Sequence, residues 1–355
     1  MNPFNLDPQA LTEELVDFNT KLTHGLQNLM DVGEIPAGVT PKEAVYQEDK
    51  LTLYRYQSPA SIVQNKTPLL IVYALVNRPY MTDLQDDRST VKGLLDAGQD
   101  VYLIDWGYPD RSDRYLTMDD YINGYIDRCI DVIRQRHKID AVNILGICQG
   151  GTFSLCYSAL HPEKVKNLIT MVTPVDFQTP DNMLSHWVQQ VDIDLLVDTQ
   201  GNIPGEMLNW TFLNMKPYQL IGQKYLAMVD ILDNEKQVKN FMRMEKWIFD
   251  SPDQAGETFR KFIKEFYQQN RLIKDELSIG GEDVRLKNVA MPVLNIFAEQ
   301  DHLVPPDASR ALKGRTGTKD YTELSFPGGH IGIYVSGRAQ KTVPPAIGEW
   351  LDKRS

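Results

Sequence analysis

Short apolar runs and longer helix-period stretches alternate along the first half of the chain. Continuous apolar runs, typical of buried parallel strands, occupy residues 68–73, 101–106, 141–147 and 168–172, and residues 51–56 alternate as a half-buried strand does. Helix-period patterns lie between them, at residues 89–97, 118–136 and 151–160. This order predicts a mostly parallel sheet with helices on both faces.

The alternation stops after Thr173. Residues 174–290 contain several tryptophans and methionines and an amphipathic stretch at 257–277, but no strand-like run. We expect these residues to form a mostly helical cap. An insertion at this point of a parallel sheet falls at the carboxyl ends of the strands, where ligands bind.

Strand patterns return near the C-terminus, at residues 293–298 and 321–326, and a final helix is expected at 339–351. Residues 41–173 and 291–355 are therefore expected to fold together as one α/β core.

Residues 1–40 are expected to form an amphipathic helical segment. Apolar side chains recur there every three or four positions, at Leu11, Leu15, Phe18, Leu22, Leu26 and Met30. Such a segment either docks on its own domain or binds a partner, and the pattern alone does not separate the two.

The most specific local motif is GICQGG at residues 146–151, between a predicted strand and a predicted helix. It matches the G-x-S-x-G nucleophile elbow of the α/β-hydrolase fold, with Cys148 in place of serine. Side chains at positions 146 and 150 would collide with the neighbouring strand and helix, so glycine is required there. The helix start beneath Cys148 favours the thiolate, and we predict Cys148 as the nucleophile.

The elbow also predicts its partners, because an acid should follow a late strand and a histidine the last strand. Asp301 and His330 occupy these two positions, and we predict them as the acid and the general base. His302 is next to Asp301 and is given an accessory role. Asp307 is a weaker candidate for the acid, since two prolines place it outside the turn.

An oxyanion would need two backbone N–H donors. Gln149, directly after the nucleophile, is expected to supply one. Val76, or a neighbour in the segment after the strand at 68–73, is expected to supply the other, although that segment lacks an HGGG pattern.

The net charge and the cysteine content limit which ligands and metal sites are expected. The net charge of −11 disfavours nucleic acid and means that an anionic ligand would need local basic groups. Arg78 and Arg88 are candidates for this, or they pair with nearby aspartates. Cys129 and Cys156 lie within helical patterns and are expected to be buried, and the cysteine spacing indicates neither a disulfide framework nor a metal site.

No segment predicts export or membrane insertion. The first ten residues lack the basic start and apolar stretch of a signal peptide, and the longest apolar run, residues 68–76, is too short to span a bilayer. A cytoplasmic location is expected.

A thiolate at this elbow favours acyl transfer from a thioester. Thiol–thioester exchange is nearly balanced in energy, so the acyl group stays activated for transfer to an alcohol. A hydrolase with a cysteine nucleophile, cleaving a thioester or an ester, is the alternative.

Several longer stretches resemble one enzyme family, the class III polyhydroxyalkanoate (PHA) synthases. The matching stretches are LLIVYALVNRPYMTDLQDDRST, DVYLIDWGYPD, NILGICQGG, MVTPVDFQTPDN, EKWIFDSPDQAGETF, NIFAEQDHLVPPDASRALKG and FPGGHIGIYVSG. The resemblance runs from about residue 44 to the C-terminus, and more loosely through the N-terminal helical segment. It implies that this chain is the catalytic subunit.

The resemblance implies polymerisation of (R)-3-hydroxyacyl-CoA, chiefly 3-hydroxybutyryl-CoA, with release of CoA and no cofactor. By position, Cys148 is the family's nucleophile, His330 its base and Asp301 its acidic residue, which either orients the histidine or activates the incoming hydroxyl. The resemblance also implies a noncatalytic second subunit (PhaE), a homo-oligomer, and action at the surface of cytoplasmic polyester granules.

Overall fold

A mostly parallel sheet forms the centre of the molecule. The computed structural model describes residue 13 and residues 38–232 and 234–355. Within them the central sheet consists, in spatial order, of β1 (Lys42–Glu48), β2 (Leu51–Tyr56), β6 (Val101–Asp105), β3 (Leu69–Val72), β7 (Val142–Ile147), β8 (Val165–Met171), β11 (Val293–Ala298) and β12 (Tyr321–Phe326). The pairs β1–β2 and β2–β6 are antiparallel, and all pairs from β6 to β12 are parallel.

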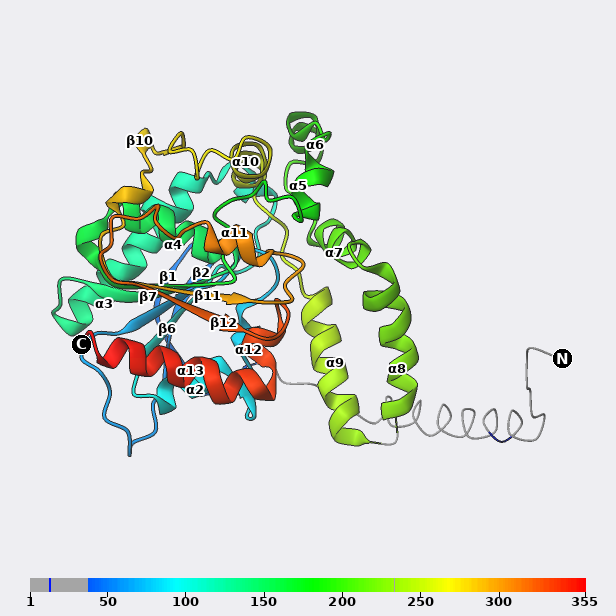
Figure 1. Ribbon diagram of the computed structural model, residues 1–355, viewed down its shortest axis with the longest axis horizontal. Coiled ribbons are helices and arrows are strands. Elements are labelled where there is room, and N and C mark those ends of the chain that lie inside the picture. Colours follow the sequence, from blue (N-terminus) through cyan, green and yellow to red (C-terminus); the bar gives the residue numbers. More distant parts are fainter. Residues whose placement is uncertain (1–12, 14–37, 233) are drawn as a thin grey trace.

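Helices cover both faces of this sheet, as predicted. On one face lie α3 (Asp127–His137), preceded by the π-helix η3 (Asp120–Ile126), and α4 (Gln149–Leu160), and on the other lie α2 (Thr90–Asp96) and α13 (Gly337–Asp352) (Figure 1). Strand β3 is apolar along its whole length because both of its faces are buried. Leu70 packs into the core on the α3–α4 side and Leu69 into the core on the α2–α13 side, because successive strand residues point to opposite faces.

The strands expected from apolar runs are confirmed to within a few residues, but β1 is not predicted. Its sequence, KEAVYQE, contains no apolar run, and its residues are exposed or half-buried. An edge strand that packs on the core only through the partly buried Val45 and Tyr46 carries little of the pattern that marks a buried strand.

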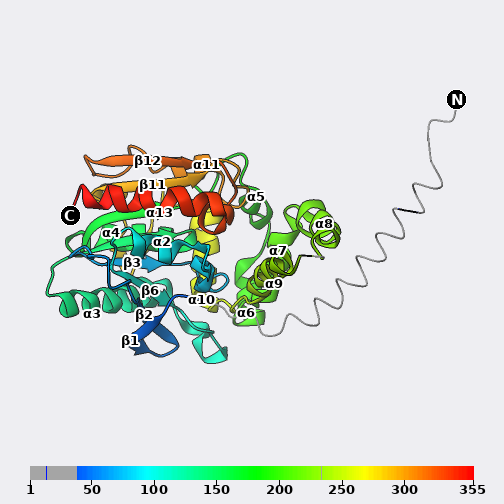
Figure 2. The same ribbon diagram turned by 90° about the horizontal axis from the view of Figure 1, so that it is seen from below.

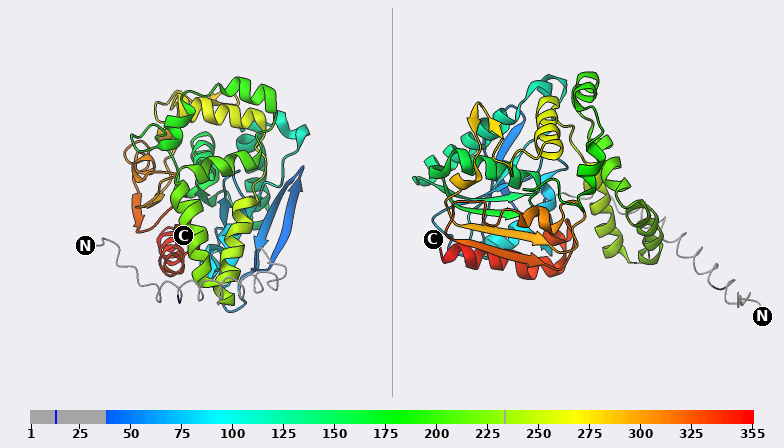
Figure 3. Two further views of the ribbon diagram at one scale, coloured as in Figure 1. Left: turned by 90° about the vertical axis from the view of Figure 1, so that its right-hand side faces the viewer. Right: turned by 45° about the horizontal axis from the view of Figure 1, so that its top comes forward.

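The connection from β8 to β11 is mostly helical, as expected for the cap. It contains α5 (Met183–Val188), α6 (Ile193–Gln200), α7 (Gly205–Asn214), η5 (Tyr218–Gln223), α8 (Lys224–Ile231), α9 (Glu235–Phe249), α10 (Gly256–Lys261) and η6 (Phe262–Gln268). Figures 1 and 2 both show α7, α8 and α9 together at one side of the sheet, opposite the C-terminus. Seen from that side, these helices lie across the end of the sheet (Figure 3).

Two details of the cap differ from expectation. The amphipathic stretch predicted at 257–277 ends as a helix at Gln268, because Asn270 adopts a left-handed conformation with φ of 53°. A short hairpin of β9 (Ser278–Ile279) and β10 (Glu282–Asp283) follows, where no strand was expected. Its two-glycine turn at 280–281 has positive φ at both positions, as tight hairpins require.

Shorter elements complete the described chain. They are η1 (Pro79–Thr82), β4 (Asp83–Gln85), β5 (Arg88–Ser89), η2 (Arg111–Tyr115), η4 (Pro162–Lys164), η7 (Leu286–Asn288), α11 (Pro306–Arg310) and α12 (Gly332–Val335). The amphipathic segment predicted for residues 1–40 lies outside the described residues, apart from residue 13 and residues 38–40.

Candidate active site

Cys148 stands at a strained turn between β7 and α4. Its backbone has φ of 55° and ψ of −125°, a conformation that residues other than glycine rarely adopt. A Cβ added at Gly146 would lie 2.5 Å from the Cα of Gly151, and one added at Gly150 would lie 2.2 Å from the carbonyl oxygen of Val72. The predicted collisions with the helix and the neighbouring strand are therefore confirmed.

The three cysteines differ in their surroundings. Cys129 and Cys156 are fully buried, and burial raises the pKa of both thiols. Cys148 is only partly buried and lies at the N-terminus of α4, where the first helical N–H groups lack partners within the helix. The expectation that two cysteines are core residues is confirmed, and only Cys148 has a setting suited to reaction.

Asp301 and His330 form a buried pair beside Cys148. His330 Nδ1 lies 2.7 Å from Asp301 Oδ2, and the other carboxylate oxygen accepts the backbone N–H groups of residues 303 and 304, each at 2.9 Å. Burial acts to lower the pKa of His330, but the charge of Asp301, together with Cys148 and hydrogen bonds to both, raises it to about 10. The buried carboxylate thus favours the protonated imidazole, the form that His330 takes when it accepts a proton.

The rival residues lack this arrangement. Burial lowers the pKa of His302, and Lys216 lowers it further. Asp307 is exposed and lies 3.7 Å from Arg310 in α11. His302 is near the pair, since the charges of Asp301 and His330 both affect its pKa, which fits an accessory position.

Other histidines within the described residues have partners of their own. The pairs are His137 with Tyr102, His161 with Asn123, and His186 with the carbonyl of Pro180. Because these histidines lie in helical or connecting segments away from strand ends, the sequence predicts structural or surface roles for them, and the contacts agree. His24 lies outside the described residues.

The first turn of α4 is tied to the segment that follows β3. The side-chain oxygen of Gln149 accepts the backbone N–H of Leu75 at 3.1 Å. This bond occupies the Leu75 amide, so that amide does not serve an oxyanion. The backbone N–H groups of Gln149 and Val76 stay predictions as oxyanion donors.

Three tyrosines that the sequence did not single out lie near enough to Cys148 for its charge to affect their pKa values. Burial raises the pKa values of Tyr73, Tyr267 and Tyr334, and the charge of Cys148 adds to each increase. The hydroxyls of Tyr73 and Tyr334 lie 3.3 Å apart. The sequence offered one signal for two of them, their position: Tyr73 ends the apolar run of β3, and Tyr334 lies four residues after His330.

Arg78 is already neutralised within the fold. Its guanidinium lies 2.7 Å from Asp105, donates to the carbonyl of Gly107 and stacks 4.1 Å from the ring centre of Tyr108. This is the pairing with a local aspartate that was the alternative to ligand binding. Arg88 is partly exposed on β5 and stays a prediction as a basic group for the ligand.

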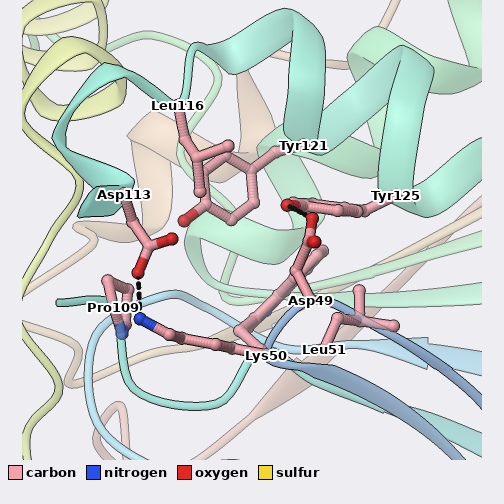
Figure 4. A pocket seen from close by; sticks show the side chains of 9 residues that line it. Asp49, Lys50, Leu51, Pro109, Asp113, Leu116, Tyr121 and Tyr125 are labelled. Atoms are coloured by element: carbon pink, nitrogen blue, oxygen red, sulfur yellow. Dashed lines mark hydrogen bonds and ion pairs between the residues drawn. The ribbon is translucent and has the colours of Figure 1, made fainter.

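A small pocket beside β2 is unsuited to a substrate. Figure 4 shows Tyr125 pointing at Asp49, a hydrogen bond of 2.7 Å, and Lys50 reaching Asp113 across the mouth. Its free volume of about 10 Å³ holds about one water molecule. None of Cys148, Asp301 or His330 lines it.

Two negative findings apply to the described residues alone. They contain no group of three or more His, Cys, Asp or Glu side chains arranged to hold a metal ion. Among the helices they form, none is both long and apolar enough to cross a membrane.

Comparison with known proteins identifies the fold of the chain. A family model for the alpha/beta hydrolase fold matches residues 67–336. A soluble variant of monoglyceride lipase from Saccharomyces cerevisiae aligns over 91% of this chain and 97% of its own, with a TM-score of 0.57 and 13% identity. Paleococcus ferrophilus monoacylglycerol lipase aligns over 85% and 99%, with a TM-score of 0.52 and 18% identity. The predicted α/β-hydrolase fold is confirmed.

Closer relatives define the family. A model described as the N-terminus of poly-beta-hydroxybutyrate polymerase (PhaC) matches residues 5–94. Proteins named poly(3-hydroxyalkanoate) polymerase subunit PhaC, from Allochromatium vinosum and Thiocystis violacea, are 68% and 67% identical over all 355 residues of this chain and their full length. One from Synechocystis is 56% identical over 96% of this chain and 92% of its own. The chain belongs to the PhaC family of poly(3-hydroxyalkanoate) polymerases, as the resemblance predicted.

Proposed function

We propose that this chain is an acyltransferase that polymerises (R)-3-hydroxyacyl-CoA, chiefly 3-hydroxybutyryl-CoA, and releases CoA. Family membership supports the reaction, and one observation supports the chemistry. The Asp301–His330 pair, with Nδ1 and Oδ2 2.7 Å apart, lies close enough to Cys148 at the strained elbow for that cysteine to contribute to the raised pKa of His330. CoA thioester is the substrate and CoA the product, so no separate cofactor is needed.

Acylation follows from this geometry. Because Nδ1 of His330 faces Asp301, Nε2 takes the proton of the Cys148 thiol, and the thiolate sulfur attacks the thioester carbonyl. The backbone N–H groups of Gln149 and Val76 bind the oxyanion. The bond from carbonyl carbon to CoA sulfur then breaks, the CoA sulfur takes the proton from His330, and the acyl group remains on Cys148.

Chain extension uses the same groups. The 3-hydroxyl of a second acyl unit attacks the carbonyl carbon held on Cys148, an ester forms, and the cysteine sulfur leaves. The hydroxyl proton passes to His330. Direct activation of the hydroxyl by Asp301 is the alternative, and it would require one of the contacts that occupy both oxygens of this buried carboxylate to break. Buried aromatic groups around the thiol help to exclude water, which would otherwise release the acyl group.

The surface of the cap supports the expected partners: the noncatalytic subunit PhaE, a second copy of this chain and the polyester granule in the cytoplasm. Large apolar side chains are exposed in this part of the chain, at Met183, Trp187, Val191, Leu195, Met207, Trp210, Tyr218, Leu226 and Phe249. Gatherings of exposed apolar groups commonly mark interaction surfaces.

Mass spectrometry after a brief reaction with 3-hydroxybutyryl-CoA tests the proposal. We expect an acyl adduct on Cys148, polymer formation with CoA release, and loss of both in Cys148→Ala. Cys156→Ala is the matched control and should retain most activity, because its thiol is buried in the core. CoA release with free 3-hydroxybutyrate as the sole product would instead support the cysteine hydrolase.

A further inference from the structure

The segment that carries Val76 is held by the cap as well as by the core. Gln254, which follows α9, donates its side-chain N–H to the carbonyl oxygen of Leu75 at 2.9 Å. The indole N–H of Trp247 donates to the carbonyl of Arg78 at 2.8 Å. Gln254 is only 3% exposed, so its bond is shielded from water.

One of these bonds bears directly on the Val76 amide. The carbonyl of Leu75 and the N–H of Val76 belong to the same planar peptide unit and point in opposite directions. Holding the Leu75 oxygen therefore sets the direction of the Val76 N–H. The N–H of Leu75 is itself bound by Gln149, so the peptides on both sides of Leu75 are fixed, one by α4 and one by the cap.

Asn77, the residue after Val76, makes a second set of hydrogen bonds to the cap. Its side-chain amide donates to the carbonyls of Trp247 and Ile248, at 3.3 and 3.2 Å, and to the hydroxyl of Ser251 at 3.1 Å. Its backbone is left-handed, with φ of 58°, a conformation that asparagine tolerates better than most residues. The cap turn at residues 247–254 thus holds positions 75 and 77, on either side of Val76.

We propose that Gln254 and Asn77 are positioning residues that aim the Val76 amide, so that the oxyanion site is complete only while the cap turn at 247–254 is docked. This inference rests on the proposed acylation of Cys148. It gives the cap a role in the chemical step, beyond covering the site, because a cap that moves away to admit substrate or polymer also releases one oxyanion donor.

The experiment compares two reactions of the same thiol. Acylation by 3-hydroxybutyryl-CoA passes through an oxyanion, whereas alkylation by iodoacetamide does not. In the full chain purified with its second subunit, Gln254→Met should lower the single-turnover acylation rate about 10- to 100-fold, since an oxyanion donor is misdirected but not removed. The alkylation rate should stay within about twofold of wild type, because it depends on the thiolate alone.

Two further variants separate positioning from folding. Asn77→Gly keeps the left-handed backbone but loses three hydrogen bonds, and it should show the same selective loss. Thr258→Val is the matched control, because the Thr258 hydroxyl in α10 also links the cap to a core carbonyl, that of Leu116 at 2.7 Å, outside residues 73–80. It should acylate at the wild-type rate.

Each outcome decides a different claim. A normal Cys148 adduct in wild type, with acylation unchanged in Gln254→Met and Asn77→Gly, would overturn the inference and leave the proposed function standing. Equal losses of acylation and alkylation would also overturn it, since they indicate general disruption. Absence of the adduct in wild type would overturn the proposed function, and this inference with it.

Discussion

Replacing Asp301 by asparagine tests the catalytic pair with little change in shape. The asparagine oxygen can keep the two backbone N–H groups that Asp301 accepts. Its NH₂ group then faces His330 Nδ1, which must become an acceptor, so the ring proton moves to Nε2. An imidazole in that tautomer cannot take the proton of the Cys148 thiol.

The expected loss can be estimated from the pKa of His330. The pair raises that pKa from 6.5 to about 10, which corresponds to about 5 kcal/mol favouring the imidazolium. Asp301 is the largest of the groups that raise it, and in Asp301→Asn burial would instead bring the pKa below 6.5. If most of this stabilisation is used in acylation, the rate should fall on the order of 10³- to 10⁴-fold.

Single-turnover release of CoA from 3-hydroxybutyryl-CoA, followed with a thiol reagent, measures this loss. Circular dichroism and the melting temperature confirm that the variant is folded. A folded Asp301→Asn variant that retained more than about a tenth of the wild-type rate would refute the reasoning, because a wrong tautomer permits no such activity.

Three further predictions concern the same site. Gly150→Ala should prevent stable folding or displace the elbow, since its Cβ would lie 2.2 Å from the backbone oxygen of Val72; a wild-type melting temperature would contradict this. His302→Gln should retain more CoA-release activity than His330→Gln, and equal losses would show that the base is wrongly assigned. Because the pKa of His330 is raised, its imidazolium stabilises the folded chain fully below pH 6.5 and progressively less as the pH rises through 10. The melting temperature should therefore decline over that range, and less steeply in His330→Gln.

The sequence predicts the sheet core and the positions of Asp301 and His330 well because both depend on local signals. A buried parallel strand must be apolar along its whole length, and an elbow must have small residues at fixed positions beside the nucleophile. Cys148, Asp301 and His330 each follow a strand, so the topology alone brings them to one edge of the sheet. The pairing of Asp301 with His330 at 2.7 Å then needs only the correct fold.

Contacts between distant segments could not be predicted in this way. Gln254 meets Leu75 across 179 positions of sequence, and nothing near either residue marks the other as its partner. The same holds for Tyr267 in η6, whose pKa the charge of Cys148 helps to raise. Edge strand β1 was missed for a different reason, since exposed strands need no periodic apolar pattern.

The left-handed backbone at Cys148 imposes opposite requirements on one position: the stability of the fold favours glycine, whereas the proposed reaction needs a thiol. Glycine would adopt φ of 55° without strain, whereas a side chain there costs on the order of 1–3 kcal/mol. Substitution of Cys148 by glycine would therefore raise stability but remove the thiol. Selection for the reactivity of the thiol is then what favours cysteine at this position. At this position the chain gives up some stability for the chemistry that a thiol can perform.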